Sequence, residues 1–140
     1  MLKRIATASI ILTLAAAGAA FAATHSTGTK VTLHSTSLGK VLAKSNGRTL
    51  YLYTPDGHNK SNCYAGCAPT WPPLMTKGKP VAGTGVKKAL LGTAKRGARL
   101  QVTYNGHPLY KFTGDVKAGD ATGEGTDGTW YVVTAAGKQK

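Results

Sequence analysis

The sequence predicts an all-β fold, a small sandwich or barrel-like sheet built from two pseudo-repeated β-hairpins. Residues 41–56 (VLAKSNGRTLYLYTPD) and 100–115 (LQVTYNGHPLYKFTGD) align without a gap when shifted by 59 positions. Each copy alternates apolar and polar residues on both sides of an Asn-Gly pair. That pattern is typical of two strands joined by a tight turn, with positive φ at both turn residues. Helical turns are considered only around the cysteines and at Ala89-Leu90-Leu91, where a short strand is the alternative.

The first 22 residues have the features of a signal peptide. Lys3 and Arg4 precede an apolar run from Ile5 to Ala17, and Ala20-Phe21-Ala22 fits a cleavage site. The run is too short to span a bilayer as a mature helix, and an uncleaved anchor is the rival interpretation. We therefore expect an extracytoplasmic bacterial protein, periplasmic or secreted, without a transmembrane segment after cleavage.

The mature chain is long enough for one compact domain. We expect an N-terminal segment with a first strand at 23–37 and a single β domain at 38–136, with the two repeats at about 39–76 and 98–134. Residues 30–38 alternate well enough for a strand. The segment after the first hairpin is interpreted as an insert without a counterpart in the second copy.

Strand alternation orients the residues of the first repeat. Tyr51 and Tyr53 point one way, and Leu50 and Leu52 point the other way. In the second copy Lys111 replaces Leu52, which indicates that the leucine face is partly wet and the aromatic face buried. The tyrosine hydroxyls then need hydrogen-bond partners. An aromatic ligand platform is the alternative.

Cys63 and Cys67 are the two cysteines, and in an exported protein such a pair most often forms a disulfide. The closed loop is so short that chain entropy predicts only about 2 kcal/mol of stabilisation. The bond would be a local staple for the segment that ends at Trp71. Ser61 or Asn62 could cap a short helical turn that carries both cysteines.

A reactive dithiol or a copper site is the alternative use of these cysteines. The C-x-x-x-C spacing differs from the motifs of thioredoxin-like proteins and haem attachment, but two cysteines three apart near a proline resemble the copper-chaperone pattern. His58, His107 or Met75 could supply a further soft ligand. The leading expectation is a protein without a cofactor.

The acidic residues suggest two further chemistries. Asp56 and Asp115 directly follow a strand and should bond backbone N–H groups in a turn, although two matching carboxylates could also form an acid/base pair for hydrolysis. The glycine-rich loop 114–129 holds four of the five acids, and calcium favours such oxygens. No G-x-S-x-G or H-E-x-x-H motif is present, so we name no catalytic residue.

Charge is the strongest compositional signal. The chain has 18 basic and 5 acidic residues, a net charge of +13. Such a charge favours anionic partners and says little about fold. No nucleic-acid-binding module is apparent, so anionic cell-envelope polymers or lipid head groups are the expected partners. A merely solvated basic surface is the alternative.

The units TLYLYTPD and PLYKFTGD resemble the Y-x-(F/W/Y)-x-x-D motif of a family of bacterial secreted repeat proteins and predicted lipoproteins. SNCYAGCAPTWPPL, QVTYNGHPLY and GTWYVV add to the similarity, which covers about residues 38–134. Six residues of this chain match the motif positions: Tyr51, Tyr53, Asp56, Tyr110, Phe112 and Asp115. Family members are frequently lipid-anchored, but this chain lacks the lipobox cysteine.

The resemblance implies a repeat fold and export, but the family has no known activity. We therefore expect a non-enzymatic binding or structural module of the cell envelope. A periplasmic thiol-redox or copper-handling protein that uses Cys63 and Cys67 is the alternative. A hydrolase that uses Asp56 and Asp115 is a third hypothesis.

Overall fold

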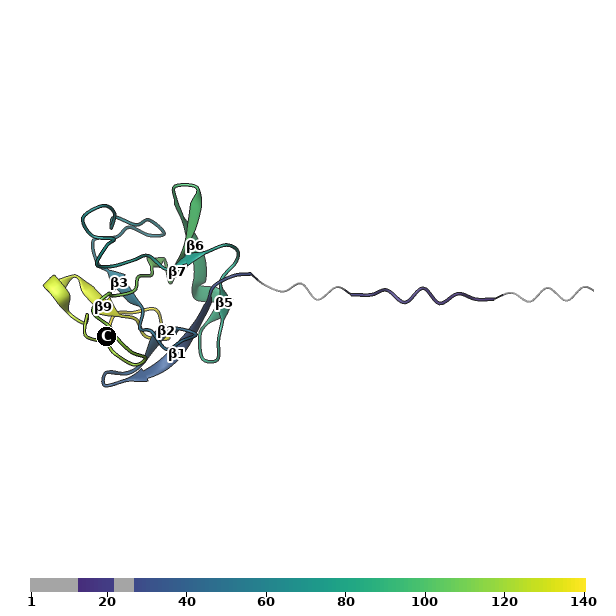
Figure 1. Ribbon diagram of the computed structural model, residues 1–140, viewed down its shortest axis with the longest axis horizontal. Helices are drawn as coiled ribbons and strands as arrows, with labels where there is room; N and C mark the ends of the chain where they lie inside the picture. The colour runs from purple at the N-terminus through teal and green to yellow at the C-terminus, as the bar shows by residue number, and fades with distance from the viewer. Residues whose placement is uncertain (1–12, 22–26) are drawn as a thin grey trace, which may run out of the picture.

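The computed structural model of the protein describes residues 13–21 and 27–140 (Figure 1). Most of the predicted signal peptide and the end of its cleavage site, Ala22, lie outside the described residues, so export by this peptide stays a prediction. Within residues 13–21 and 27–140, no helix is long and apolar enough to cross a membrane.

The domain consists of short strands and two single-turn 3₁₀ helices. In chain order they are β1 (Lys30–Thr36), β2 (Gly39–Lys44), β3 (Tyr51–Tyr53), β4 (Met75–Thr76), β5 (Val81–Ala82), η1 (Lys88–Leu90), β6 (Leu91–Arg96), β7 (Arg99–Tyr104), β8 (His107–Pro108), η2 (Thr126–Gly128) and β9 (Trp130–Val132).

The strands form three small sheets. Their orders are β2-β1-β5, β3-β9 and β4-β7-β6, with β8 paired to β7. All pairs are antiparallel except β1 with β5. Figure 1 shows β9, near the C-terminus, beside β3 of the first repeat, and the turn of the β6–β7 hairpin at the top of the view. The all-β prediction is confirmed, and the open sheets give a sandwich rather than a closed barrel.

The two Asn-Gly turns differ in geometry. In the second repeat Asn105 and Gly106 both have positive φ, 50° and 78°, as a two-residue hairpin turn requires. In the first repeat only Gly47 has positive φ, 81°. The N–H of Lys44 there bonds the carbonyl of Arg48 at 2.9 Å, so the loop has three residues. The prediction of positive φ at Asn46 is therefore wrong, because the extra residue lets glycine alone take the left-handed position.

The two repeats are interlocked through their central strands. Tyr51 and Tyr110, equivalent residues, exchange backbone hydrogen bonds of 2.9 and 3.0 Å. Tyr51 then pairs with Val132 of the second repeat, and Tyr110 pairs with Pro73 of the first. A pseudo-twofold axis therefore passes between the two tyrosines, and each repeat completes the sheet of the other.

The segment after the first hairpin does have a counterpart, contrary to the prediction of an insert. Trp71 and Trp130 are separated by the same 59 positions as the hairpins. The N–H of Thr54 bonds Thr129, and the N–H of Thr113 bonds Thr70, at 2.9 and 3.1 Å. The two segments thus occupy equivalent places although their sequences have little in common. One is closed by the disulfide, and the other by glycine-rich turns and η2.

The expected helical turn in the first segment is minimal. The N–H of Ala68 bonds the carbonyl of Tyr64 at 2.6 Å, and the N–H of Trp71 bonds that of Cys67 at 3.0 Å. These are successive turns that do not merge into a helix. Pro72 and Pro73 follow at once, and proline cannot continue a helix.

A column of four aromatic rings crosses the pseudo-twofold axis. Trp71 and Trp130 stack at its centre with a centroid distance of 3.9 Å and an interplanar angle of 2°. Phe112 stacks on Trp71, and Tyr53 stacks on Trp130, both at 4.3 Å. Each outer ring therefore belongs to the opposite repeat from the tryptophan that it covers. Stacked aromatic pairs add stability beyond the area that they bury.

Both faces of the β3 strand are buried. Tyr51 and Tyr110 are fully buried with the tryptophans in one core. Leu50 and Leu52 are buried in a second core, which contains Val31, Leu42, Leu74, Val102 and Leu109. The prediction of a partly wet leucine face is therefore wrong for the first repeat. Lys111 is half-buried and marks a place where the two repeats differ.

The pseudo-symmetry predicts that the two tryptophans contribute equally to the free energy of unfolding. Trp71→Ala and Trp130→Ala should each lower the free energy of unfolding by about 3–5 kcal/mol, because each removes a buried ring from the column. Urea unfolding followed by circular dichroism measures this. Val116→Ala, at a residue that is 79% exposed, should change it by about 0.5 kcal/mol or less. A large cost for only one tryptophan would contradict the symmetric column.

Candidate functional site

The motif tyrosines and aspartates pair across the repeats. The hydroxyl of Tyr51 donates to Asp115 Oδ2, and the hydroxyl of Tyr110 donates to Asp56 Oδ2, both at 2.7 Å. The second oxygen of each carboxylate holds the following loop. Asp56 Oδ1 accepts the N–H of Asn62 at 2.7 Å, and Asp115 Oδ1 accepts the N–H of Thr122 at 2.9 Å. The motif is thus a cross-repeat clasp.

Burial sets the proton affinities of these groups. Desolvation raises the pKa of both Tyr51 and Tyr110 above the usual range, so each phenol keeps its proton and donates. Desolvation also raises the pKa of Asp56, against the hydrogen bonds from Asn62 and Tyr110 and the charge of Arg96. The turn role expected for the two aspartates is present. The hydrolase hypothesis gains no support, because both oxygens of each carboxylate already accept hydrogen bonds within the domain.

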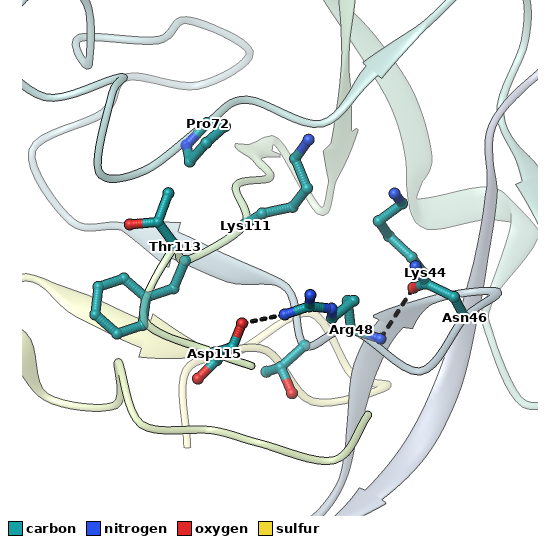
Figure 2. Close-up of a pocket in the computed structure, with 9 residues that line it drawn as sticks. Lys44, Asn46, Arg48, Pro72, Lys111, Thr113 and Asp115 are labelled. Atoms are coloured by element: carbon teal, nitrogen blue, oxygen red, sulfur yellow. Dashed lines mark hydrogen bonds between the residues drawn. The ribbon is translucent and has the colours of Figure 1, made fainter. Parts of the chain in front are cut away.

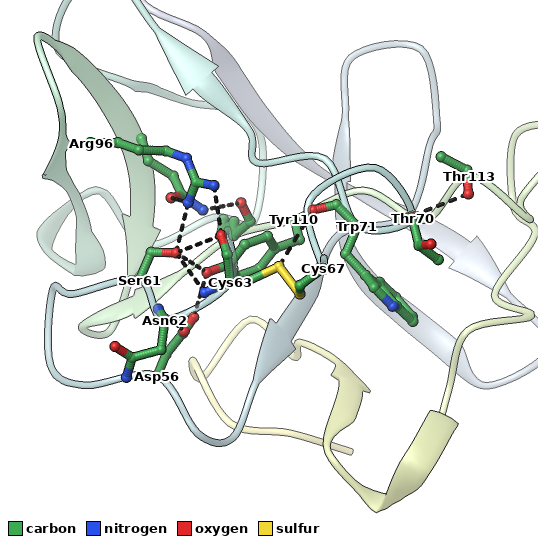
Figure 3. The surroundings of a disulfide bond; sticks show 12 residues. Asp56, Ser61, Asn62, Cys63, Cys67, Thr70, Trp71, Arg96, Tyr110 and Thr113 are labelled. Carbon is green, nitrogen blue, oxygen red and sulfur yellow. Dashed lines mark hydrogen bonds between the residues drawn. A yellow bond between two sulfur atoms is a disulfide. The ribbon is translucent and has the colours of Figure 1, made fainter. Parts of the chain in front are cut away.

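Cys63 and Cys67 form a disulfide with a Cα–Cα distance of 5.2 Å (Figure 3). Cys63 is fully buried beside Trp71. Arg96 of the second repeat donates to the Cys63 carbonyl at 2.6 Å and to Ser61 Oγ at 2.7 Å. Ser61 Oγ lies 2.6 Å from the Tyr110 hydroxyl. The disulfide therefore secures the loop that carries one end of the clasp.

The proposed copper ligands are only partly assembled. Burial and the nearby charge of His58 lower the pKa of His107, so these two histidines are neighbours. Met75 lies on β4, paired with Gln101. Within the described part of the chain, no group of three or more His, Cys, Asp or Glu residues could hold a metal ion. The copper hypothesis stays an untested prediction.

The acids of the glycine-rich loop accept hydrogen bonds from the chain itself. Asp120 Oδ2 accepts the N–H groups of Val116 and Lys117, both at 2.9 Å, and these bonds lower its pKa. Glu124 Oε2 accepts the N–H of Val132 at 2.6 Å. The Asp120 bonds close a turn within the loop, and the Glu124 bond ties the loop to β9. Both are structural uses of oxygens considered for calcium.

A cavity lined by cationic side chains lies at the junction of the repeats (Figure 2). Its volume is about 310 Å³. Lys44 and Arg48 come from the first repeat, and Lys111 from the second. Asn46, Thr49 and Thr113 add polar groups to the lining. We call it the cation cavity.

The cationic side chains of the cation cavity are close enough to affect one another. Burial, and then the nearby charge of Lys44, lower the pKa of Lys111. Arg48 is held in place by a hydrogen bond to the backbone carbonyl of Asp115 (Figure 2). The Asp115 carboxylate is engaged by Tyr51 and Thr122 instead. The cavity can therefore attract an anion and give it several donors.

The cation cavity was not predicted from the sequence. Lys44 and Lys111 are far apart in the chain, and their meeting depends on the crossing of the repeats. The one available signal was the substitution of Lys111 for the buried Leu52 at equivalent positions. A charged residue in a core position of one repeat indicates that this copy lines a solvent-accessible space there.

A second hollow, which we call the aromatic groove, is lined by all four rings of the column. It is lined by Tyr53, Thr70, Trp71, Phe112, Thr129 and Trp130, among others, and its volume is about 490 Å³. Phe112 lines both the aromatic groove and the cation cavity. The two hollows are therefore neighbours on the molecule.

Fold and site together define an all-β domain made of two interlocked repeats. Residues 32–75 and 92–134 match a family described as a secreted repeat of unknown function, and the chain belongs to that family. The two matched stretches include both tryptophans, in agreement with the structural equivalence of the two segments. No curated protein matches the chain. No solved structure matches it either.

The pairing of Tyr and Asp predicts that removal of either tyrosine hydroxyl lowers the stability of the domain. Tyr51→Phe and Tyr110→Phe should each lower the free energy of unfolding by about 1–3 kcal/mol, because each leaves a carboxylate oxygen without its donor. Tyr64→Phe is the matched control, since Tyr64 is 50% exposed and contacts Arg96 through its ring. Urea unfolding of the three variants tests the clasp, and equal stability of all three would contradict it.

Proposed function

We propose that this protein is an exported, non-enzymatic module of the bacterial cell envelope that binds anionic groups. The observation that carries the proposal is the convergence of Lys44, Arg48 and Lys111 on one cavity. Both repeats contribute, so the cavity exists only in the folded domain. The family description as a secreted repeat agrees with export.

The distribution of acids supports the proposal. Asp56, Asp115, Asp120 and Glu124 accept hydrogen bonds from backbone N–H and hydroxyl groups, and none of those bonds comes from a lysine or arginine side chain. The carboxylates are thus occupied in holding loops. Removal of the predicted signal peptide with Lys3 and Arg4 would leave 16 basic and 5 acidic residues, a net charge of +11, which would attract external anions at long range.

An anion in the cation cavity would be stabilised in two ways. It would accept charge-assisted hydrogen bonds from the lysines and the arginine, which are stronger than those between neutral groups. It would also offset the burial and the repulsion from Lys44 that together lower the pKa of Lys111. Envelope polymers and lipid head groups carry such anions. A thiol-redox or copper role for Cys63 and Cys67 is a second proposal, and no contact among the described residues favours it.

A charge-matched pair of variants tests the cavity. Lys44→Gln with Lys111→Gln should weaken binding of short-chain polyphosphate about fivefold to tenfold, on the order of 1 kcal/mol for partly exposed charge pairs. Isothermal titration calorimetry at low salt measures the affinity, because screening weakens such contacts as salt rises.

Lys87→Gln with Lys88→Gln is the control. It removes the same charge from two exposed residues next to β6, so it should change the affinity by less than about twofold if the cavity is the site. Equal losses for both double variants would show that general charge, and not the cation cavity, attracts the anion.

A further inference from the structure

The aromatic groove is symmetric in a way that the cation cavity is not. Three of its lining pairs are equivalent positions of the two repeats: Tyr53 with Phe112, Thr70 with Thr129, and Trp71 with Trp130. The groove therefore straddles the pseudo-twofold axis. Any ligand there meets the same chemistry from both repeats.

Both tryptophans that line this groove have an indole N–H without a partner among the described residues. Every buried side-chain nitrogen and oxygen of the described residues has a hydrogen-bond partner. Neither indole N–H donates to another described residue, so both nitrogens must reach solvent. Trp71 and Trp130 are only 5% and 3% exposed. The small accessible part of each tryptophan therefore includes its one hydrogen-bond donor.

The ring faces are unavailable, so recognition must use the edges. Each tryptophan is covered on both faces, by the other tryptophan and by Phe112 or Tyr53. Stacking of a ligand on a tryptophan face is thus blocked. A ligand in the groove would accept hydrogen bonds from the two indole edges instead.

The remaining lining suits a neutral group that both accepts and donates hydrogen bonds. Thr70 is exposed and supplies a hydroxyl, and Asp127 supplies an exposed carboxylate. No lysine or arginine lines the groove. The carboxylate disfavours an anion here and accepts hydroxyl donors. Hydroxyl groups meet both requirements, since each can donate and accept.

We infer that the aromatic groove is a carbohydrate subsite, and that the anionic ligand of the cation cavity is an acidic polysaccharide. The inference rests on the proposed function and adds the substrate class. Phe112 lines both hollows, so one chain can place a charged group among Lys44, Arg48 and Lys111 and neighbouring sugar hydroxyls along the indole edges.

The two tryptophans make the test site-specific, because the chain has only two. In a ¹H–¹⁵N spectrum the two indole N–H signals report on the two tryptophans that line the groove. Partly methyl-esterified oligogalacturonate, which carries neutral sugars beside charged ones, should shift both indole signals. Polyphosphate, which has charge but no sugar, should bind and leave both signals unmoved.

Three results separate this inference from the proposed function. If both probes bind through Lys44 and Lys111 and neither shifts the indole signals, the carbohydrate subsite is wrong and the anion site stands. If neither probe binds at low salt, both are wrong. If vesicles containing phosphatidylglycerol bind and oligogalacturonate does not, the ligand is a lipid head group and the acidic polysaccharide is excluded.

Asp127→Asn is the variant least able to disturb the fold. Asp127 is exposed and has a φ of 54°, a conformation that asparagine also adopts readily. The Asp127→Asn substitution should weaken oligogalacturonate binding about threefold to tenfold, the effect of one lost hydrogen bond. It should leave polyphosphate binding unchanged. Trp71→Phe should do the same by removing one indole donor. An unchanged affinity for oligogalacturonate in both variants would overturn the inference.

Discussion

The hydrogen bonds from Tyr51 to Asp115 and from Tyr110 to Asp56 determine how the rest of the structure is arranged. Each joins a buried phenol of one repeat to a carboxylate of the other. Because each carboxylate also holds the loop that leads to a tryptophan, the clasp positions the aromatic column as well. The repeats therefore form one cooperative unit, not two units in series.

The same crossing creates the candidate sites. Lys44, at the end of β2, and Lys111, in the segment that follows β8, line one cavity because the two repeats pair through Tyr51 and Tyr110. Thr70 and Thr129 line one groove because the backbone of each bonds the opposite repeat, Thr70 to Thr113 and Thr129 to Thr54. A binding surface built at such a junction needs both copies, and this gives a physical reason for a tandem repeat within one domain.

Local patterns predicted the elements, but they could not predict the partners of each strand. Alternation placed the hairpins, and the Asp after each strand was expected to bond backbone N–H groups, as it does. The pairing of Tyr51 with the distant Asp115 was not predictable, because two copies of one motif are equally consistent with pairing within a repeat. The segment ending at Trp71 was taken for an insert because its sequence diverges from that ending at Trp130. The cation cavity was missed because its residues meet only through that crossing.

The most direct test of the interlocked fold is to divide the chain in the exposed stretch at Thr84 and Gly85, between β5 and η1. Fragments 23–84 and 85–140 would be compared by ¹H–¹⁵N spectra alone and mixed. The crossed pairing predicts that neither fragment folds alone, and that the equimolar mixture gives the spectrum of the intact domain. Two fragments that each show a dispersed, folded spectrum in isolation would contradict it.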